Sequence, residues 1–442
     1  MKRTSLFVAL LILLAGCDNS LESDRFQTES EDAVATQLNL SSEPANFAIA
    51  IEDAELLIDD NSPLLVPDLG PRGNSLARLG RVLFYEKQLS QNGTISCASC
   101  HKQSDGFADS QRFSAGFDGG LTSRQAMSVA NVRFYRSGRM FWDERAESLE
   151  AQALAPIQNP VEMGLTLEEA VQRVEDQPYY EALFVDAFGD AVVTSDRIAE
   201  AIATFERAIV STNSRYDEWL RAGGNNADVV AGQGGGNPGI GGGNRGGRGR
   251  NGGPGGRVGP NGAGGPNGPG GPRGQGGPGP AGINPPRGPA DGVQGAQPIG
   301  ILTVQEDLGR RLFFSRRTRC STCHSGNAFV GDRPRNNGLD LDTSADEGAG
   351  NGRFKMASLR NIEMTAPYMH DGRFSTLDEV IEFYNNGIQA HPNLDNRLTN
   401  RQGNPVRMNL NQNERDALVA FLKALTDESL ATEERFSDPF NN

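Results

Sequence analysis

Apolar residues along most of the chain recur at the spacing of a helix. Leu76, Leu79, Val82 and Leu83 fall on one helical face. The same periodicity predicts further helices within residues 166–188, 195–221, 376–386 and 411–426. Because little of the chain alternates between apolar and polar residues, the pattern predicts a mainly α fold.

One of these patterns occurs twice. The sequence Leu-Gly-Arg-Val-Leu-Phe-Tyr spans residues 79–85, and Leu-Gly-Arg-Arg-Leu-Phe-Phe spans residues 308–314. A similar segment follows each of them, at residues 106–109 and 329–332. This self-similarity predicts two copies of one structural unit.

Each copy contains a Cys-x-x-Cys-His motif. Its residues are Cys97, Cys100 and His101 in the first copy and Cys320, Cys323 and His324 in the second. Two thiols a helical turn apart can add to the two vinyl groups of haem, and the adjoining His can bind the iron. The motifs therefore predict two covalently bound c-type haems. A zinc site of four thiolates or two redox dithiols would need no His after each pair.

The N-terminus predicts export. Lys2 and Arg3 precede an apolar run at residues 6–14, which is too short to span a bilayer. The run ends in Leu-Ala-Gly before Cys17, which resembles the lipobox of bacterial lipoproteins. We therefore expect a signal peptide over residues 1–16 and a lipid anchor at Cys17, on the periplasmic side of a bacterial membrane. The alternative is an ordinary signal peptide with a chance Cys.

Composition and charge narrow the class of protein. The chain has 442 residues, 37% hydrophobic residues and a formal net charge of −14. This length is enough for two or three folded units, and the low apolar content indicates that part of the chain does not fold. The acidic charge argues against a nucleic-acid partner.

The organisation that follows has two cytochrome c-like haem domains with a disordered Gly/Pro-rich insertion between them. The insertion is too poor in apolar residues to fold, and it is either a solvated loop or a basic flexible arm for an acidic partner or the cell wall. The expected segments are a signal peptide at 1–16, a solvated tether and lead-in at 17–64, an N-terminal domain at 65–231, the insertion at 232–296, a C-terminal domain at 297–430 and a tail at 431–442.

Each motif His fills one of the two axial positions of a haem iron. There is no His between His101 and His324, so the first haem lacks a His partner in its own domain. An iron left five-coordinate can bind peroxide, whereas a six-coordinate iron mostly passes electrons. Other candidate ligands are Met127, Met140 and Met163 for the first haem, and His370, His391, Met356, Met364, Met369, Met408 and Tyr384 for the second.

Several longer motifs carry a family resemblance. Residues 141–152, 160–164, 358–361 and 365–372 resemble segments of the bacterial di-haem cytochrome c peroxidases and their relative MauG. The resemblance covers about residues 65–225 and 297–428, in the same order. It implies an oxidoreductase that reduces H2O2 at the N-terminal haem, with electrons relayed through the C-terminal haem. The donor would be a small periplasmic protein or an oxidisable protein residue.

The resemblance also implies roles for individual residues. Trp142 corresponds to a tryptophan between the haems, and Glu162 to the acid–base group that moves a proton between the peroxide oxygens. Gln152 and Pro156 correspond to residues that line the same pocket. The structural alternatives are a core position for Trp142, a surface turn for Glu162 and helix-end positions for Gln152 and Pro156.

Tyr384 lies 14 residues after His370, where the better-known peroxidases have an iron-binding Met and the MauG-like branch has Tyr. The resemblance therefore implies that Tyr384 binds the second iron and that the enzyme needs no reductive activation. The alternative is a packing role for Tyr384, with Met369, His370 or His391 as the ligand.

The resemblance also implies a bound calcium ion, and one alternative function stays open. The family binds Ca²⁺ through a Thr-x-Pro segment, matched by Thr365 and Pro367, and an Asn, whose place Gln125 takes here. The competing hypothesis to a peroxidase is a non-enzymatic di-haem electron-transfer lipoprotein with two six-coordinate irons.

Overall fold

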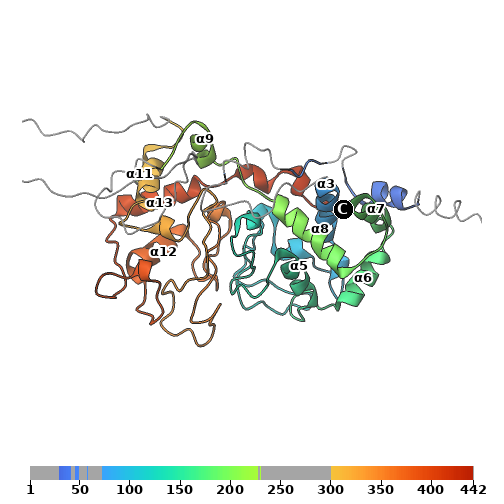
Figure 1. Ribbon diagram of the computed structural model, residues 1–442, viewed down its shortest axis with the longest axis horizontal. Helices are drawn as coiled ribbons and strands as arrows, with labels where there is room; N and C mark the ends of the chain where they lie inside the picture. Colours follow the sequence, from blue (N-terminus) through green and yellow to red (C-terminus); the bar gives the residue numbers. More distant parts are fainter. Residues whose placement is uncertain are drawn as a thin grey trace, which may run out of the picture. The chain divides into compact units, whose positions relative to one another are not determined.

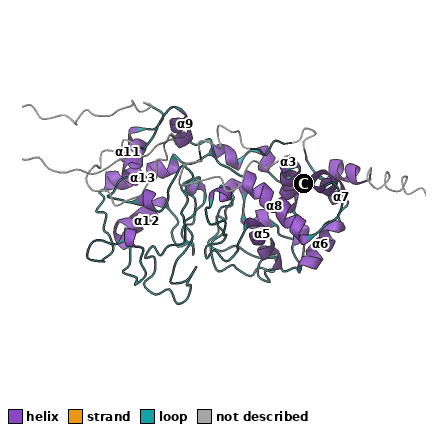
Figure 2. Cartoon of the chain, in the orientation of Figure 1, coloured by secondary structure: helices purple, strands orange, loops and turns teal. Residues whose placement is uncertain are grey.

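The computed structural model describes residues 29–40, 45–48, 57, 72–226, 229 and 300–441. Helices and loops make up this part of the chain, and no strand occurs within it (Figure 2). The prediction of a mainly α fold is confirmed. Cys17, the predicted signal peptide and the Gly/Pro-rich insertion lie outside the described residues.

The α-helices fall into an N-terminal and a C-terminal group (Figure 1). Those that follow residue 72 are α3 (Gly73–Tyr85), α4 (Cys97–Cys100), α5 (Leu149–Gln158), α6 (Leu167–Glu175), α7 (Tyr180–Phe188), α8 (Ser195–Ala208), α9 (Arg215–Arg221), α11 (Val304–Phe313), α12 (Leu377–Glu382) and α13 (Gln412–Lys423). A π-helix, η6 (Phe383–Gly387), continues α12. The short 3-10 helices are η1 (Lys87–Leu89), η2 (Gln103–Asp105), η3 (Val132–Phe134), η4 (Cys320–Thr322), η5 (Ile362–Met364), η7 (Asn396–Leu398), η8 (Glu428–Ala431) and η9 (Glu434–Phe436).

Two predicted helices are each divided in the structure. The stretch 166–188 breaks between α6 and α7 around Pro178, because proline disfavours helical geometry in the residue before it. The stretch 195–221 breaks after α8, and a new helix, α9, begins at a Ser214 capping box. Both differences arise from local breaks that the apolar periodicity does not register.

The sequence repeat corresponds to a repeated helix pair. Helix α3 packs on α8, and α11 packs on α13. A Cβ at Gly80 would lie 1.9 Å from the carbonyl oxygen of Ala201, and one at Gly309 would lie 1.8 Å from that of Ala417. Only glycine allows this close approach, so the same helix contact is built in both halves.

The loops that carry the two motifs also repeat. The backbone N–H of His101 donates to Cys97 O at 2.9 Å, and that of His324 donates to Cys320 O at 3.0 Å. Each His is followed by a short loop closed by an isolated bridge, Lys102 to Ala108 in the first copy and Ser325 to Val330 in the second. The two imidazoles therefore leave equivalent backbone positions.

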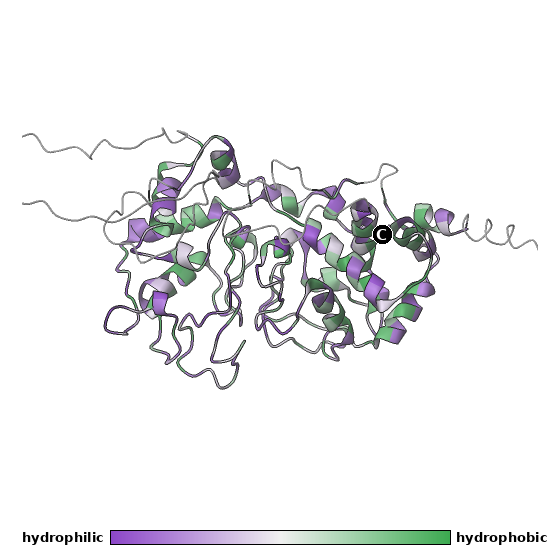
Figure 3. Ribbon diagram, in the orientation of Figure 1, coloured by the Kyte–Doolittle hydropathy of each residue, from purple (hydrophilic) through white to green (hydrophobic). Residues whose placement is uncertain are grey.

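Each half has its own apolar core. Figure 3 shows that apolar and polar segments alternate along the helices, as expected for amphipathic helices that bury one side. Phe84 and Phe205 join α3 to α8 in the first core, and Phe313 and Phe421 join α11 to α13 in the second. Helix α9, expected in the N-terminal domain, packs into the second core instead.

The predicted lead-in and tail contribute to the first core. Residues 29–37, expected to be solvated tether, form a helix, and Phe47 is buried against α3 and α8. The chain after α13 returns towards α3 (Figure 1), where the Tyr85 hydroxyl donates to Phe436 O at 2.8 Å. Phe436 is fully buried. Residues 431–441 thus cover the N-terminal half, because a few apolar side chains there complete its core.

Candidate functional site

Each half contains a cavity beside its Cys-x-x-Cys-His motif. The N-terminal cavity has a volume of about 520 Å³ and is lined by Cys100 and His101. The C-terminal cavity, of about 170 Å³, is lined by Cys320, Cys323 and His324. Cys97 lines a small adjoining cavity that also borders Cys100 and His101. The structure therefore gathers each motif around its own cavity.

Both imidazoles are prepared to bind a metal in the neutral form. His101 Nδ1 lies 3.2 Å from Phe107 O, and because a carbonyl only accepts, Nδ1 carries the proton. Its Nε2 is then the metal-binding nitrogen. Burial lowers the pKa of His101 and lowers that of His324 to about 4. A neutral imidazole with one free nitrogen is the form that binds iron.

The four motif sulfur atoms lie in buried surroundings that disfavour the thiolate form. Among the described cysteines there is no disulfide. Burial raises the pKa of Cys320 to about 11 and raises that of Cys97 further. The thiols are thus neither paired with one another nor set up as reactive thiolates, which disfavours the redox-dithiol alternative.

The side of the N-terminal cavity formed by α5 and the turn after it brings three predicted residues together. Gln152, Pro156 and Glu162 all line the cavity. Helix α5 begins at Ser148, whose Oγ accepts from Ala151 N at 3.1 Å, and this places Gln152 and Pro156 four residues apart on one face. The turn then brings Met163 N to Pro156 O at 3.2 Å, which returns Glu162 towards the same cavity.

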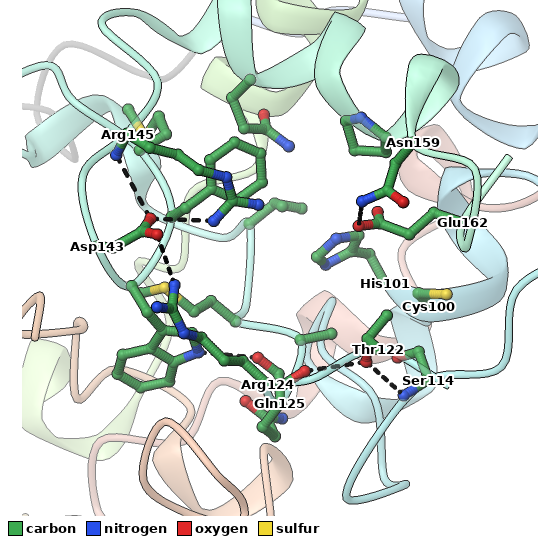
Figure 4. Close-up of a pocket in the computed structure, with 18 of the residues that line it drawn as sticks. Cys100, His101, Ser114, Thr122, Arg124, Gln125, Asp143, Arg145, Asn159 and Glu162 are labelled. Atoms are coloured by element: carbon green, nitrogen blue, oxygen red, sulfur yellow. Dashed lines mark hydrogen bonds and ion pairs between the residues drawn. The ribbon is translucent and has the colours of Figure 1, made fainter. Parts of the chain in front are cut away.

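The Glu162 carboxyl is half-buried and held by one neighbour. Asn159 Nδ2 donates to Glu162 Oε1 at 2.8 Å, and Glu162 and His101 line the same cavity (Figure 4). Burial raises the pKa of Glu162, and the nearby charge of Arg145 only partly opposes this. Within the described residues, the buried Gln152 Oε1 has no hydrogen-bond partner. These two polar groups are therefore available to a molecule bound in the cavity.

Trp142 lies where the two cavities approach each other, since it lines both. Its indole Nε1–H donates to Gln125 O at 2.8 Å. Its backbone carbonyl accepts from Lys355 N at 2.8 Å. Trp142 is thus fixed at both its ring and its backbone.

Tyr384 lines the C-terminal cavity from the π-helix that follows α12. Such an added residue in a helix often occurs at functional sites, because it re-aims a side chain. Asn337 Nδ2 donates to the Tyr384 hydroxyl at 3.4 Å. Burial raises the pKa of Tyr384 to about 12, so the phenol is neutral unless a metal ion binds its oxygen.

The other candidate ligands of the haem irons lie in different places in the structure. Met127 and Met140 line the N-terminal cavity, and Met163 lines the small adjoining one. Around the C-terminal cavity, the lining side chains are Met356, Met369, His370, Met408 and Tyr384. His391 lies elsewhere, where it contacts Asn336 Nδ2 at 3.1 Å and Thr343 Oγ1 at 3.3 Å.

The residues of the expected calcium site also meet. Gln125, Thr365 and Pro367 line one small cavity of about 60 Å³. Gln125 Nε2 donates to Asp109 O at 3.2 Å, which leaves its carbonyl oxygen as the candidate ligand. Calcium binding stays a prediction, and a loss of activity on chelation that added Ca²⁺ reverses would support it.

Two residues of the site were not predicted from the sequence. Asn159 holds Glu162, and Lys355 lies beside Trp142 and lines both main cavities. Lys355 is 3% exposed. In the sequence, Lys355 is a single Lys between Phe354 and Met356. The apolar periodicity predicts a surface position for such a residue.

The donor sets fit two covalent haems. Each cavity presents two thiols and a neutral imidazole from one motif, on equivalent backbone loops. No cluster of three or more His, Cys, Asp or Glu suited to a metal ion alone occurs in the part of the chain that is described. The fold and the two sites therefore define a c-type protein with two haems.

Comparison with known proteins shows which proteins this chain resembles. The family model for di-haem cytochrome c peroxidases matches residues 74–225. Cytochrome c551 peroxidase of Nitrosomonas europaea is 29% identical over 84% of this chain and 86% of its own length. MauG of Methylorubrum extorquens, a methylamine utilization protein, is 28% identical over 83% of this chain and 82% of its own length.

A solved structure agrees with these matches. A MauG-like protein associated with microbial copper homeostasis superposes with a TM-score of 0.58 at 26% identity, covering 90% of this chain and 99% of that one. The chain is therefore similar to the di-haem cytochrome c peroxidases and MauG proteins. It is an oxidoreductase of the peroxidase type with two c-type haems.

Proposed function

We propose that this protein reduces H2O2 in the N-terminal cavity with electrons that pass through Trp142 from the C-terminal haem. The electron source is a small periplasmic donor of the cytochrome c type or an oxidisable protein, as for a MauG-like enzyme. The observation that carries the proposal is the difference between the two cavities. The N-terminal cavity has one His, the thioethers of Met127 and Met140 and two available polar groups, whereas the C-terminal cavity adds a second His, His370, and the phenol of Tyr384 to its motif His.

The protein's own groups supply the proton chemistry. Reduction of H2O2 consumes two protons and two electrons and yields two waters. Glu162 accepts the proton of one peroxide oxygen and donates it to the other, which then leaves as water. Its raised pKa suits both transfers, because the carboxyl must release the proton as readily as it takes it.

Gln152 and Trp142 serve the remaining needs of the reaction. The unpaired Oε1 of Gln152 accepts a hydrogen bond from the bound peroxide and orients it towards Glu162. The bound haem iron supplies the coordination site for peroxide and the redox chemistry that cleaves its O–O bond. Trp142 supplies a π-system between the two cavities for the electrons.

Ligand binding to the oxidised holoprotein tests the proposal. We expect cyanide or H2O2 to shift a high-spin haem band, because the N-terminal site keeps an open position. Two low-spin haems that respond to neither ligand would contradict it and would indicate an electron-transfer protein.

In this proposal, Tyr384 supports a MauG-like enzyme. As a phenolate ligand it lowers the potential of the C-terminal haem, since it donates more charge than a thioether. We expect the fully oxidised protein to react rapidly with H2O2 without prior reduction. Tyr384→Met should raise the C-terminal midpoint potential in a redox titration. An unchanged potential and spectrum would show that Tyr384 only packs.

Membrane attachment is a separate part of the proposal. The lipobox-like segment before Cys17 supports a lipid anchor on the periplasmic side. Within the described residues, no helix has the length and apolar character needed to cross a bilayer. Incorporation of labelled fatty acid that Cys17→Ala abolishes would support the anchor, and its absence from the native protein would contradict it.

A further inference from the structure

Trp142 sits at the tip of a tight loop, residues 139–147, which we call the relay loop. Met140 N donates to Ala146 O at 2.9 Å to close the loop. Inside it, Phe141 and Glu144 both have positive φ angles, 70° and 54°. Residues with side chains rarely adopt this geometry, and contacts from outside the loop help to hold it in place.

Lys355 of the C-terminal half supplies three of those contacts. Its backbone N–H donates to Trp142 O at 2.8 Å. Its Nζ donates to Arg139 O at 2.7 Å, at the start of the relay loop, and to Glu144 Oε1 at 3.1 Å, on the far side of Trp142. One side chain thus ties both ends of the strained turn to the other half of the protein.

Lys355 is itself held firmly. Its neighbour Phe354 exchanges two backbone hydrogen bonds of 2.9 Å with Arg335, and its ammonium lies 4.0 Å from the centre of the Tyr135 ring. The Lys355 and Glu144 side chains are 4% and 11% exposed. A buried ion pair is costly to assemble and adds little stability over apolar residues. Stability alone therefore does not explain the Lys355–Glu144 pair.

The position of Lys355 between the two cavities indicates a second role. In the described part of the chain, Trp142 and Lys355 are the only two residues that line both haem cavities. We infer that Lys355 is the positioning residue of the electron relay and that it fixes the Trp142 ring relative to both haems. The inference rests on the proposed electron route and adds a residue to it.

Three variants distinguish a role of Lys355 in positioning Trp142 from a role in folding. Lys355→Met keeps the backbone hydrogen bond and the apolar stem but strands the Glu144 carboxylate. The double variant Lys355→Met/Glu144→Gln removes that stranded charge. Lys423→Met is the matched control, because Lys423 pairs with Glu363 at 2.9 Å on the surface, where the two side chains are 51% and 39% exposed.

Electron transfer between the haems is measured directly by flash photolysis of CO from the half-reduced holoprotein, with both midpoint potentials determined by redox titration. We expect transfer in Lys355→Met to slow severalfold, because a Trp142 ring that is no longer fixed relative to both haems lengthens the path between them. The double variant should regain the unfolding midpoint of the wild type but not its transfer rate. Lys423→Met should match the wild type.

Wild-type transfer rates in both Lys355 variants would overturn the inference while leaving the proposed function intact. Recovery of the rate together with the unfolding midpoint in the double variant would also overturn it, since Lys355 would then act only on folding. A wild-type protein that binds no CO would overturn the open coordination site of the proposed function, and the inference with it.

Discussion

Glu162→Gln is expected to lower the turnover number for H2O2 by about 10²- to 10⁴-fold, the usual contribution of a general acid–base group. The amide keeps the size of the side chain and can still contact Asn159, but it cannot accept and return a proton. Both haems should remain attached, because Glu162 takes no part in either motif. The loss is measured by steady-state peroxidase kinetics on holoprotein with both haems confirmed by mass.

The proton transfer by Glu162 predicts how kcat/KM for H2O2 changes with pH. Glu162 must be ionised to accept the first proton, so wild-type kcat/KM should fall as the pH drops through its raised pKa. In Glu162→Gln this acid limb should be absent, because the group that produces it is gone. A variant that keeps the limb would assign it to another group.

Glu147→Gln is the matched control. The Glu147 side chain is 86% exposed and, among the described residues, pairs with the surface residue Arg139. We expect its kinetics to equal those of the wild type. If Glu162→Gln behaves like this control, Glu162 is a structural acid at a turn and the proton route proposed above is wrong.

The parts of the protein set by local covalent chemistry could be predicted from the sequence. The Cys-x-x-Cys-His motifs require no knowledge of the fold, because their spacing is fixed by the chemistry of haem attachment. The repeat was equally readable, since Gly80 and Gly309 occupy the same place in matching segments and make the same helix contact. A further part of the repeat went unrecognised. Asn131 and Asn361 both adopt positive φ angles before a 3-10 helix, and each lies three residues after a Ser.

Features that depend on distant contacts could not be predicted. Phe436 reads as part of a polar tail, and only its burial against the N-terminal half gives it a role. Lys355 reads as a surface residue, because its partners Glu144 and Arg139 lie over two hundred positions earlier in the chain. In both cases the surroundings come from segments that periodicity treats as independent.

The break between α8 and α9 has the same origin. The backbone amides of Thr212 and Asn213 both donate to Asp427 Oδ2 at 3.0 Å, and Ser211 N donates to Asn131 Oδ1 at 3.1 Å. These acceptors satisfy the backbone groups that a continuous helix would otherwise pair internally. The connection is therefore extended because distant residues compensate for the lost helix.

Arg360→Met is expected to destabilise the protein by about 3–5 kcal/mol, the cost of leaving a buried partner uncompensated. Arg360 makes two hydrogen bonds to the Asp217 carboxylate, of 2.8 and 2.6 Å, and both side chains are fully buried. It also donates to Ser211 O at 3.2 Å, so it fixes the connection that leads into α9. Denaturant unfolding of the holoprotein measures the loss.

The partner and surface variants test the cause. Arg360→Met/Asp217→Asn removes the stranded charge and should recover part of the lost stability. Lys423→Met breaks an exposed pair and should change the free energy of unfolding by only about 0–1 kcal/mol. Equal effects of Arg360→Met and Lys423→Met would show that the buried pair is not needed for the fold.

The contribution of Asp217 to stability should depend on pH in opposite directions in the wild type and in Arg360→Met. In the wild type, burial would raise the pKa of Asp217, but the charge and hydrogen bonds of Arg360 outweigh it and the pKa is lowered. Its stabilising contribution is therefore present above the ordinary carboxyl pKa and is lost as the pH falls through the lowered value. Without Arg360, the hydrogen bonds from Ser214 are left to oppose burial, so the pKa should rise and protonation of Asp217 should relieve the variant. We therefore expect the stability difference between wild type and Arg360→Met to shrink as the pH falls, and a constant difference would assign the loss to packing rather than to the stranded charge.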